Sequence, residues 1–181
     1  MDRAKSKRLV IDADVLHSAG GEEATHPMAK HCRDFLKAVL TICHRAVRTP
    51  LIDEEGNRHS SNFSRKWRVS MNSKKKLEHA QTESEEARSL LHDIEQTVVS
   101  GNDLDAVRKD IHLIHAAFAA DRSIVSCDET ARQLFGNASA AVSDLSSIVW
   151  VNPDREEEKP IPWLEDGAEA EPSRLLCRKR K

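Results

Sequence analysis

The stretch that decides the fold is DIHLIHAAFAADRSIVSCDETARQLF, residues 110–135. Its first part continues a helical stripe of apolar residues spaced three and four apart, namely Leu104, Val107, Ile111, Ile114 and Phe118. The segment Ser123–Ser126 (SIVS) predicts a short buried strand, which is followed by Cys127-Asp128. Glu129–Phe135 predicts a second helix, and Gly136-Asn137 is a stop signal. The order helix, strand, acid, helix is typical of an α/β protein.

A second short apolar run near the start of the chain also ends in an acid. Residues 9–11 (LVI) predict a buried strand that is followed by Asp12. In a parallel sheet the carboxyl ends of the strands meet at one edge, so Asp12 and Asp128 should open onto the same edge. Asp110 lies one turn from both Val107 and Ile114, which predicts a position at the margin of the core. Three carboxylates are therefore expected near one another.

The rest of the chain alternates helices and strands. Helices are predicted over 27–46, near 61–72 and over 77–99. A weak strand is predicted over 47–52, where Pro50 interrupts the pattern, and a last strand over 147–151. This alternation favours a parallel sheet that helices cover on both faces.

Residues 1–153 are predicted to form one domain, with a helical insertion at about 56–100. Beyond it, residues 154–181 are rich in acids and then end in a basic run. We expect this segment to be an extended tail that docks in part through Trp163 and Leu164.

Composition excludes several classes of protein. A chain of 181 residues with 39% hydrophobic residues suits one core, and its net charge of −2 gives no global attraction to nucleic acid or to a membrane.

The cysteines have no CxxC pair, which favours reduced thiols in a cytosolic protein over a disulfide frame or a zinc site; they are Cys32, Cys43, Cys127 and Cys177. The apolar run behind the basic N-terminus is too short for a signal peptide or a membrane span, so a cytoplasmic location is expected.

Three carboxylates at one edge of a sheet repel one another, and the usual reason to tolerate this repulsion is a divalent cation. Hard oxygen ligands select Mg²⁺ or Mn²⁺. Such an ion lowers the pKa of a bound water and neutralises charge that builds on a phosphate, which are the two needs of phosphodiester hydrolysis. The competing interpretation of each single acid is a helix cap or a solvated charge, and for Asp128, before a predicted helix, capping competes directly with catalysis.

With these residues in view, the chain resembles the PIN-domain family of ribonucleases. The family carries a first acid in an apolar-Asp-x-Asn/Asp-apolar motif, seen here as VIDADVL, residues 10–16. The segment 110–135 resembles its second half, in which an Asp opens a helix rich in alanine and leucine and a further acid follows the next strand. The resemblance covers roughly residues 8–151. It implies a three-layer α/β/α sandwich and a metal-dependent endoribonuclease that hydrolyses RNA.

The resemblance also implies roles for particular residues. Asp12, Asp110 and Asp128 would hold the metal and act in catalysis, and Asp14 would support the metal from behind these ligands. Glu55 is our choice for a further catalytic acid in the middle of the chain, and Asp53 and Glu54 compete with it.

Many members of the family are toxins of bacterial toxin–antitoxin modules, so an antitoxin partner and a homodimer are further implications. The long segment 56–100 and the acidic tail depart from those toxins.

A basic stretch without acids follows Glu55. Its cations could bind the phosphate backbone of RNA, or they could form a solvated helix face; they are Arg58, Arg65, Lys66, Arg68, Lys74, Lys75 and Lys76. Trp67 recurs four residues after Phe63 and four before Met71, which predicts a core position over base stacking. His112 and His115 are three apart on one predicted helix, and we assign them packing or surface roles over a shared metal.

Two other functions stay open. VIDADV also fits the DxDx(T/V) opening of haloacid-dehalogenase-like phosphatases, in which the first Asp is a nucleophile and the second a general acid. SCDE (126–129) lacks the glycine that usually precedes the later acids of that family. The alternative from a different class is a PIN-like module that binds RNA or protein without cleaving anything.

Overall fold

The computed structural model describes residues 6–58 and 60–177. The first five residues and the basic end of the predicted tail, 178–181, lie outside this range. The strands are β1 (Arg8–Ile11), β2 (Arg45–Arg48), β3 (Leu77–His79), β4 (Ser123–Val125) and β5 (Val149–Val151). The helices are α1 (Ala13–Ser18), α2 (Pro27–Thr41), α3 (Pro50–Arg58), α4 (Asn62–Ser73), α5 (Glu85–Glu95), α6 (Gly101–Phe118), α7 (Glu129–Ala138) and α8 (Pro160–Glu165).

The strands form a five-stranded sheet in the order β3-β2-β1-β4-β5, and every pairing in it is parallel. The predicted α/β class with a central parallel sheet is confirmed. β1 lies in the middle of the sheet, and its register pairs Ile11 with Val125 of β4. Because of this register, Asp12 and Ser126 leave the sheet side by side.

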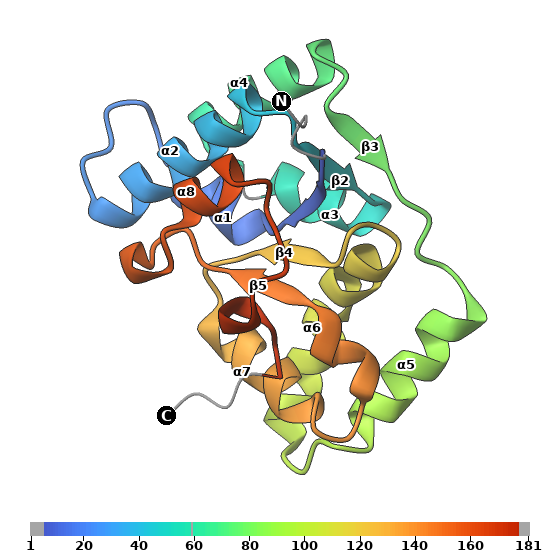
Figure 1. Ribbon diagram of the computed structural model, residues 1–181. Helices are drawn as coiled ribbons and strands as arrows, with labels where there is room; N and C mark the ends of the chain where they lie inside the picture. Colours follow the sequence, from blue (N-terminus) through green and yellow to red (C-terminus); the bar gives the residue numbers. More distant parts are fainter. Residues whose placement is uncertain (1–5, 59, 178–181) are drawn as a thin grey trace.

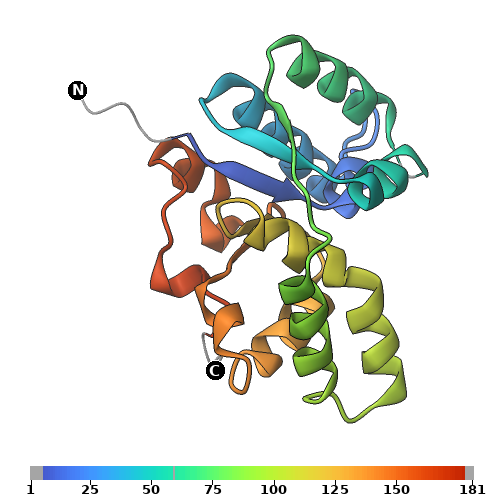
Figure 2. The ribbon, with the colours of Figure 1, turned by 90° about the vertical axis from the view of Figure 1, so that its right-hand side faces the viewer.

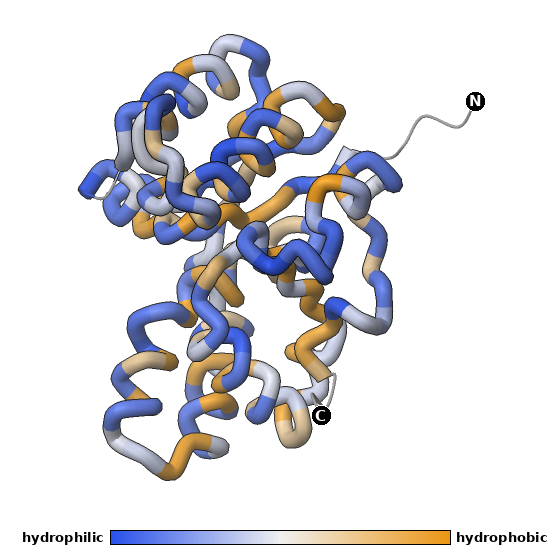
Figure 3. Tube along the Cα trace, turned by 90° about the vertical axis from the view of Figure 1, so that its left-hand side faces the viewer, coloured by the Kyte–Doolittle hydropathy of each residue, from blue (hydrophilic) through white to orange (hydrophobic). Residues whose placement is uncertain are grey.

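Helices cover both faces of the sheet, so the molecule has the three layers that were predicted (Figure 1). Successive strand residues point to opposite faces. Val10, Ile124 and Trp150 pack under α6 and α7, whereas residues on the other face, such as Leu9 and Val149, pack against α1, α2 and α8. Orange, hydrophobic segments of the chain run through the middle of the molecule, and blue, hydrophilic ones dominate the outer turns (Figure 3).

The segment after β2 differs from the prediction of a strand over 47–52. The strand ends at Arg48 and α3 begins at Pro50. Proline suits the first turn of a helix, and the Thr49 hydroxyl accepts a hydrogen bond from Ile52 N–H at 3.2 Å, which caps that turn. Local capping chemistry therefore starts a helix where the apolar pattern suggested a strand.

The predicted helix over 77–99 is wrong in its first part. Leu77–His79 forms β3, an edge strand that pairs with β2, and α5 begins only at Glu85. An edge strand is covered less than a central one, and the β3 residues are half-buried or exposed, so they show no apolar run. Thus the segment 56–100 contributes one strand of the sheet in addition to helices. α5 and the first turns of α6 lie side by side and extend beyond the sheet (Figure 2).

The tail is packed more closely than the extended appendage that we predicted. Trp163 and Leu164 of α8 are 2% and 0% exposed, and the Trp163 indole N–H donates to the Glu169 carbonyl at 2.8 Å. Further on, Leu175 forms an antiparallel bridge with Val149, and Leu176 N–H donates to the Ile148 carbonyl at 3.0 Å. The segment therefore folds back along the edge strand β5.

Within residues 6–58 and 60–177, no helix is both long enough and apolar enough to cross a membrane.

Candidate active site

The sheet has a switch point between β1 and β4. From β1 the chain builds β2 and β3 on one side, through helices on one face, and then β4 and β5 on the other side. In such sheets a crevice forms at the carboxyl ends of the strands where the order reverses, and ligands bind there. Asp12 follows β1 and the segment Ser126–Asp128 follows β4, so both lie at this point. The topology alone marks this edge as the first place to look for a site.

Ser126 joins the acids that leave β1 and β4. Its hydroxyl donates to Asp12 Oδ2 at 2.8 Å and lies 3.3 Å from Asp14 Oδ2, and it accepts a hydrogen bond from Asp128 N–H at 3.0 Å. Because the hydroxyl carries one proton, it serves one of the two carboxylates at a time. Ser126 is fully buried, and our sequence analysis did not single it out. A serine at the end of a strand, two residues before an acid, is the signal that could have indicated it.

Asp12 and Asp128 each begin a helix. Asp12 is the N-cap of α1, and its Oδ1 lies 3.5 Å from Asp14 N. Asp128 is the N-cap of α7, where its Oδ1 accepts from Ala131 N–H at 2.9 Å. The capping interpretation of Asp128 is therefore correct: one carboxylate oxygen, Oδ1, caps α7. A cap occupies one carboxylate oxygen, so the structural role and a ligand role do not exclude each other.

Asp110 belongs electrostatically to the same cluster. It lies on α6, half-buried, and burial raises the pKa of its carboxyl, while Lys109 lowers that pKa and the charges of Asp12 and Asp128 raise it further. Burial likewise raises the pKa of Asp12, although the Ser126 hydroxyl acts in the opposite direction. The charges of Asp12 and Asp128 thus disfavour the ionised form of Asp110.

Asp53, Glu54 and Glu55 are the candidates for the further catalytic acid. Of these three, Glu55 is the one whose charge raises the pKa of Asp12. Glu55 Oε2 lies 3.2 Å from His112 Nε2. Asp53 is held instead by Arg48, whose Nε donates to the two carboxylate oxygens at 2.9 and 3.0 Å and whose Nη2 donates to Oδ2 at 2.7 Å. Glu54 pairs with Arg58 on the surface. The geometry thus separates a site-facing glutamate from two acids with structural partners.

His112 is a buried neighbour of the cluster. Its Nδ1 donates to the Lys109 carbonyl at 2.9 Å, and its Nε2 lies toward Glu55 but has no hydrogen-bond partner among the described residues. The charge of His112 lowers the pKa of both Asp12 and Asp110. His112 is thus buried, as the predicted packing role requires, and it also lies beside the acids.

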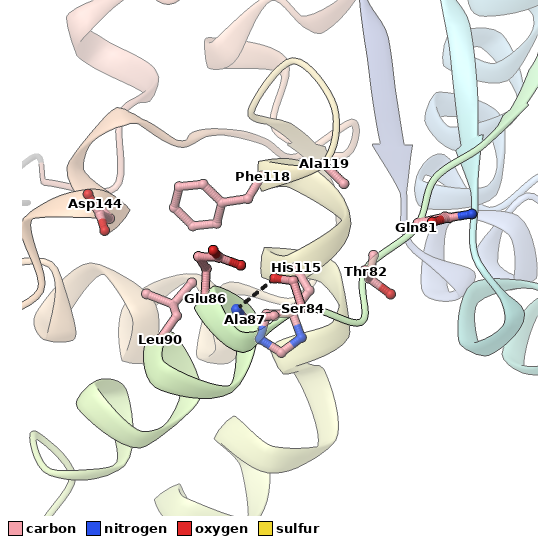
Figure 4. Close-up of a pocket in the computed structure, with 10 residues that line it drawn as sticks. All are labelled: Gln81, Thr82, Ser84, Glu86, Ala87, Leu90, His115, Phe118, Ala119 and Asp144. Carbon is pink, nitrogen blue, oxygen red and sulfur yellow. Dashed lines mark hydrogen bonds between the residues drawn. The ribbon is translucent and has the colours of Figure 1, made fainter.

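His115 faces a different space from His112. It helps to line a cavity of about 290 Å³ between α5, the end of α6 and the turn at Asp144, together with Leu90 and Phe118 (Figure 4). His112 is not among the residues that line this cavity.

Asp14 lies on α1, two residues after Asp12, and contacts the backbone of the segment after β4. Its Oδ2 accepts from Cys127 N–H at 2.9 Å, and its Oδ1 is buried with no hydrogen-bond partner among the described residues. Burial and the adjacent charge of Asp12 raise the pKa of Asp14 to about 8. At neutral pH Asp14 is therefore mostly protonated, and one of its oxygens lacks a partner.

The donor chemistry fits a hard divalent cation, because several carboxylate oxygens lie at one edge with few opposite charges. In the described part of the chain, no three His, Cys, Asp or Glu side chains are already close enough together to form a ligand set. Mg²⁺ typically binds proteins through one or two carboxylates and keeps several waters, so it does not require three protein ligands in place. In charge and donor type, the residues fit such an ion.

The basic stretch divides into surface and structural residues. The Lys76 ammonium contacts the carbonyl oxygens of Val39, Leu40 and Ile42 at the end of α2, and Arg68 contacts Asn57 and Asp53. These two cations stabilise the fold. The exposed members of the stretch are Arg58, Arg65, Lys66, Lys74 and Lys75, of which Arg58 pairs with Glu54 and Lys66 with Glu22.

Trp67, within the basic stretch, is 4% exposed, and its indole N–H donates to the Leu36 carbonyl at 2.6 Å. It occupies the predicted core position.

No protein-family model, no curated protein and no solved structure matches this chain. The arguments for its function therefore come from its own residues and their geometry.

Proposed function

We propose that the protein is a metal-dependent endoribonuclease of the PIN type, which hydrolyses phosphodiester bonds of RNA with Mg²⁺ or Mn²⁺. Two observations support the proposal: Asp12 and Asp128 follow neighbouring strands at the switch point of a parallel sheet, and burial together with the charges of these two acids raises the pKa of Asp110. A protein gains no stability from such an arrangement, so a ligand of positive charge is the physical reason to keep it.

In this proposal each residue has a definite task. Asp12, Asp110 and Asp128 hold the cation, Ser126 fixes the direction of the Asp12 carboxylate by its hydrogen bond of 2.8 Å, and Asp14 supports Ser126 and the Cys127 backbone from behind. The bound ion supplies an activated water and stabilises charge on the phosphate. Glu55, with His112 at 3.2 Å, is the group best placed to accept a proton from that region of the site.

The exposed cations Arg58, Arg65, Lys66, Lys74 and Lys75 are proposed to contact the backbone of RNA. The cysteines form no disulfide, which supports a reducing compartment such as the cytoplasm.

The test is cleavage of single-stranded RNA with and without Mg²⁺ or Mn²⁺. The wild type cuts RNA only with the metal, and Asp12→Asn and Asp128→Asn lose at least about a hundredfold in rate, as is usual when a group that stabilises the transition state is removed. Asp105→Asn is the matched control, because Asp105 is an exposed acid of the same helix as Asp110. It should keep wild-type activity.

Other outcomes would replace the proposal. RNA binding without cleavage in any metal, unchanged by Asp110→Asn, would indicate a binding module. Turnover of a phosphate monoester, with phosphate trapped on Asp12, would indicate a phosphatase.

A toxin role is a separate part of the proposal. Expression of the wild type in a bacterial host would then arrest growth, Asp12→Asn would not, and a small protein that binds the chain would relieve the arrest. Normal growth with the active wild type would reject the toxin role and leave the nuclease in place.

A further inference from the structure

Lys109 places a mobile positive charge at the acidic site. Its Nζ lies 3.5 Å from Asp110 Oδ1. The adjacent Arg108 points elsewhere, to Glu95 at 2.6 Å. This lysine thus forms an ion pair with one of the proposed metal ligands.

The contact is loose. The Lys109 side chain is 71% exposed and Asp110 is 14% exposed, so the ammonium approaches the carboxylate from solvent. An exposed ion pair at this distance contributes little to stability and is readily exchanged. The flexible four-carbon stem also lets the ammonium move several ångströms without any change in the backbone.

A divalent cation and this ammonium would compete for the same carboxylate. Two positive charges within a few ångströms repel each other, so the divalent cation, which has the higher charge, displaces the ammonium from the carboxylate. Once displaced, the ammonium remains tethered beside the metal by its place on α6, next to Asp110. A phosphate oxygen of a bound strand is the negative partner that it would meet there.

On the basis of the proposed nuclease function, we propose that Lys109 is an internal counter-ion, which holds Asp110 in the metal-free protein, gives way to the divalent cation, and then binds a phosphate of the RNA. Lys109 is thus a positioning residue for both states of the site. In the metal-free protein the Lys109 ammonium supplies positive charge in place of the divalent cation, and in the metal-bound protein it contributes to substrate binding.

The first test uses the metal alone. Mn²⁺ binding is titrated in the wild type and in Lys109→Met, Lys109→Arg and Lys30→Met. Lys109→Met should bind Mn²⁺ roughly five- to tenfold more tightly, since a competing charge is gone, and Lys109→Arg should resemble the wild type. Lys30 is an exposed lysine of α2 and is the control for charge in general. Equal affinity of Lys109→Met, Lys30→Met and the wild type would overturn the proposal.

The second test follows the ammonium itself. Acetylation of Lys109 by an amine-reactive reagent, measured by mass spectrometry, should become faster when Mg²⁺ saturates the protein, while that of Lys30 stays constant. In RNA cleavage, Lys109→Met should raise KM by about tenfold with a smaller change in kcat, and Lys109→Arg should restore the KM. A wild-type KM in Lys109→Met would remove Lys109 from substrate binding.

The two levels of proposal fail in different ways. If neither the wild type nor Lys109→Met binds a divalent cation, the nuclease function and the role of Lys109 both fall. If both bind it with the same affinity and cleave RNA, the nuclease stands and only the role of Lys109 falls.

Discussion

Two clusters of buried charge in this protein contrast in how they are neutralised. Glu158, at the start of the tail, accepts from Arg132 at 2.6 Å and from Asn152 N–H at 3.2 Å, and Arg174 contacts its backbone carbonyl. At the switch point, by comparison, Asp12 and Asp110 have like charges as neighbours and a loosely held Lys109. The first cluster is complete within the chain and fixes the tail to α7. The second is left with excess negative charge, which is what distinguishes a site from a structural network.

Breaking the complete cluster should have the largest effect. Arg132→Ala leaves the Glu158 carboxylate, 14% exposed, without its closest cation, and should lower the free energy of unfolding by roughly 3 kcal/mol. Denaturant unfolding measures this change. Arg155→Ala, which removes a cation that is 43% exposed, is the control and should cost less than about 1 kcal/mol. Equal losses in the two variants would erase the contrast.

The pH dependence of stability tests the acidic cluster at the switch point. Asp14 has a folded-state pKa of about 8, above its value of 3.8 in the unfolded chain. Its protonated form therefore stabilises the fold fully below pH 3.8, and this stability is lost as pH rises toward 8. In metal-free buffer the wild type should lose up to about 1.4 kcal/mol per pH unit between pH 5 and pH 7, relative to Asp14→Asn. Parallel pH profiles of the two proteins would show that Asp14 ionises normally.

The basic stretch contains the same division between structural and free charge. Lys76→Met removes hydrogen bonds to the carbonyls at the end of α2 and should cost roughly 2 kcal/mol of stability. Lys75→Met should leave the unfolding transition unchanged, because Lys75 is exposed, and should weaken RNA binding with a smaller salt dependence. Thermal unfolding measures the first effect and filter binding the second. A loss of stability in Lys75→Met, with unchanged stability in Lys76→Met, would contradict this division of the basic stretch.

The smallest expected effect is a gain in stability, whereas the structural variants above are expected to lose stability. Asp110→Asn removes a carboxylate whose pKa is raised by burial and by its acidic neighbours, so the variant should be slightly more stable than the wild type. Asp105→Asn should change nothing. A loss of stability in Asp110→Asn would mean that Asp110 has a structural role like that of Glu158.

The sequence predicts the central part of this fold because its strands are short, fully buried runs that end in acids. LVI-Asp12 and SIVS-Cys127-Asp128 carry in their local pattern both the strands and the two acids that follow them at one edge of the sheet. β3 escapes prediction because an edge strand with exposed and half-buried residues has no apolar signature. The helix at 50–58 escapes because Thr49 and Pro50, rather than periodicity, start it.

The candidate site is only partly visible in the sequence. Asp12, Asp110 and Asp128 follow from topology, but Ser126, Lys109 and His112 depend on the direction of side chains in three dimensions. The same holds for the choice of Glu55 over Asp53, because the arginines that hold Asp53 come from β2 and α4. Spacing along the chain does not encode such partners.

The central claim is that Asp12, Asp110 and Asp128 share one divalent cation. A crystal grown or soaked with Mn²⁺ tests it directly through the anomalous scattering of the metal. The account predicts an anomalous peak at the carboxyl ends of β1 and β4, within ligand distance of at least two of these carboxylates. A map without a peak there, from crystals in which Mn²⁺ is bound elsewhere on the protein, would contradict it.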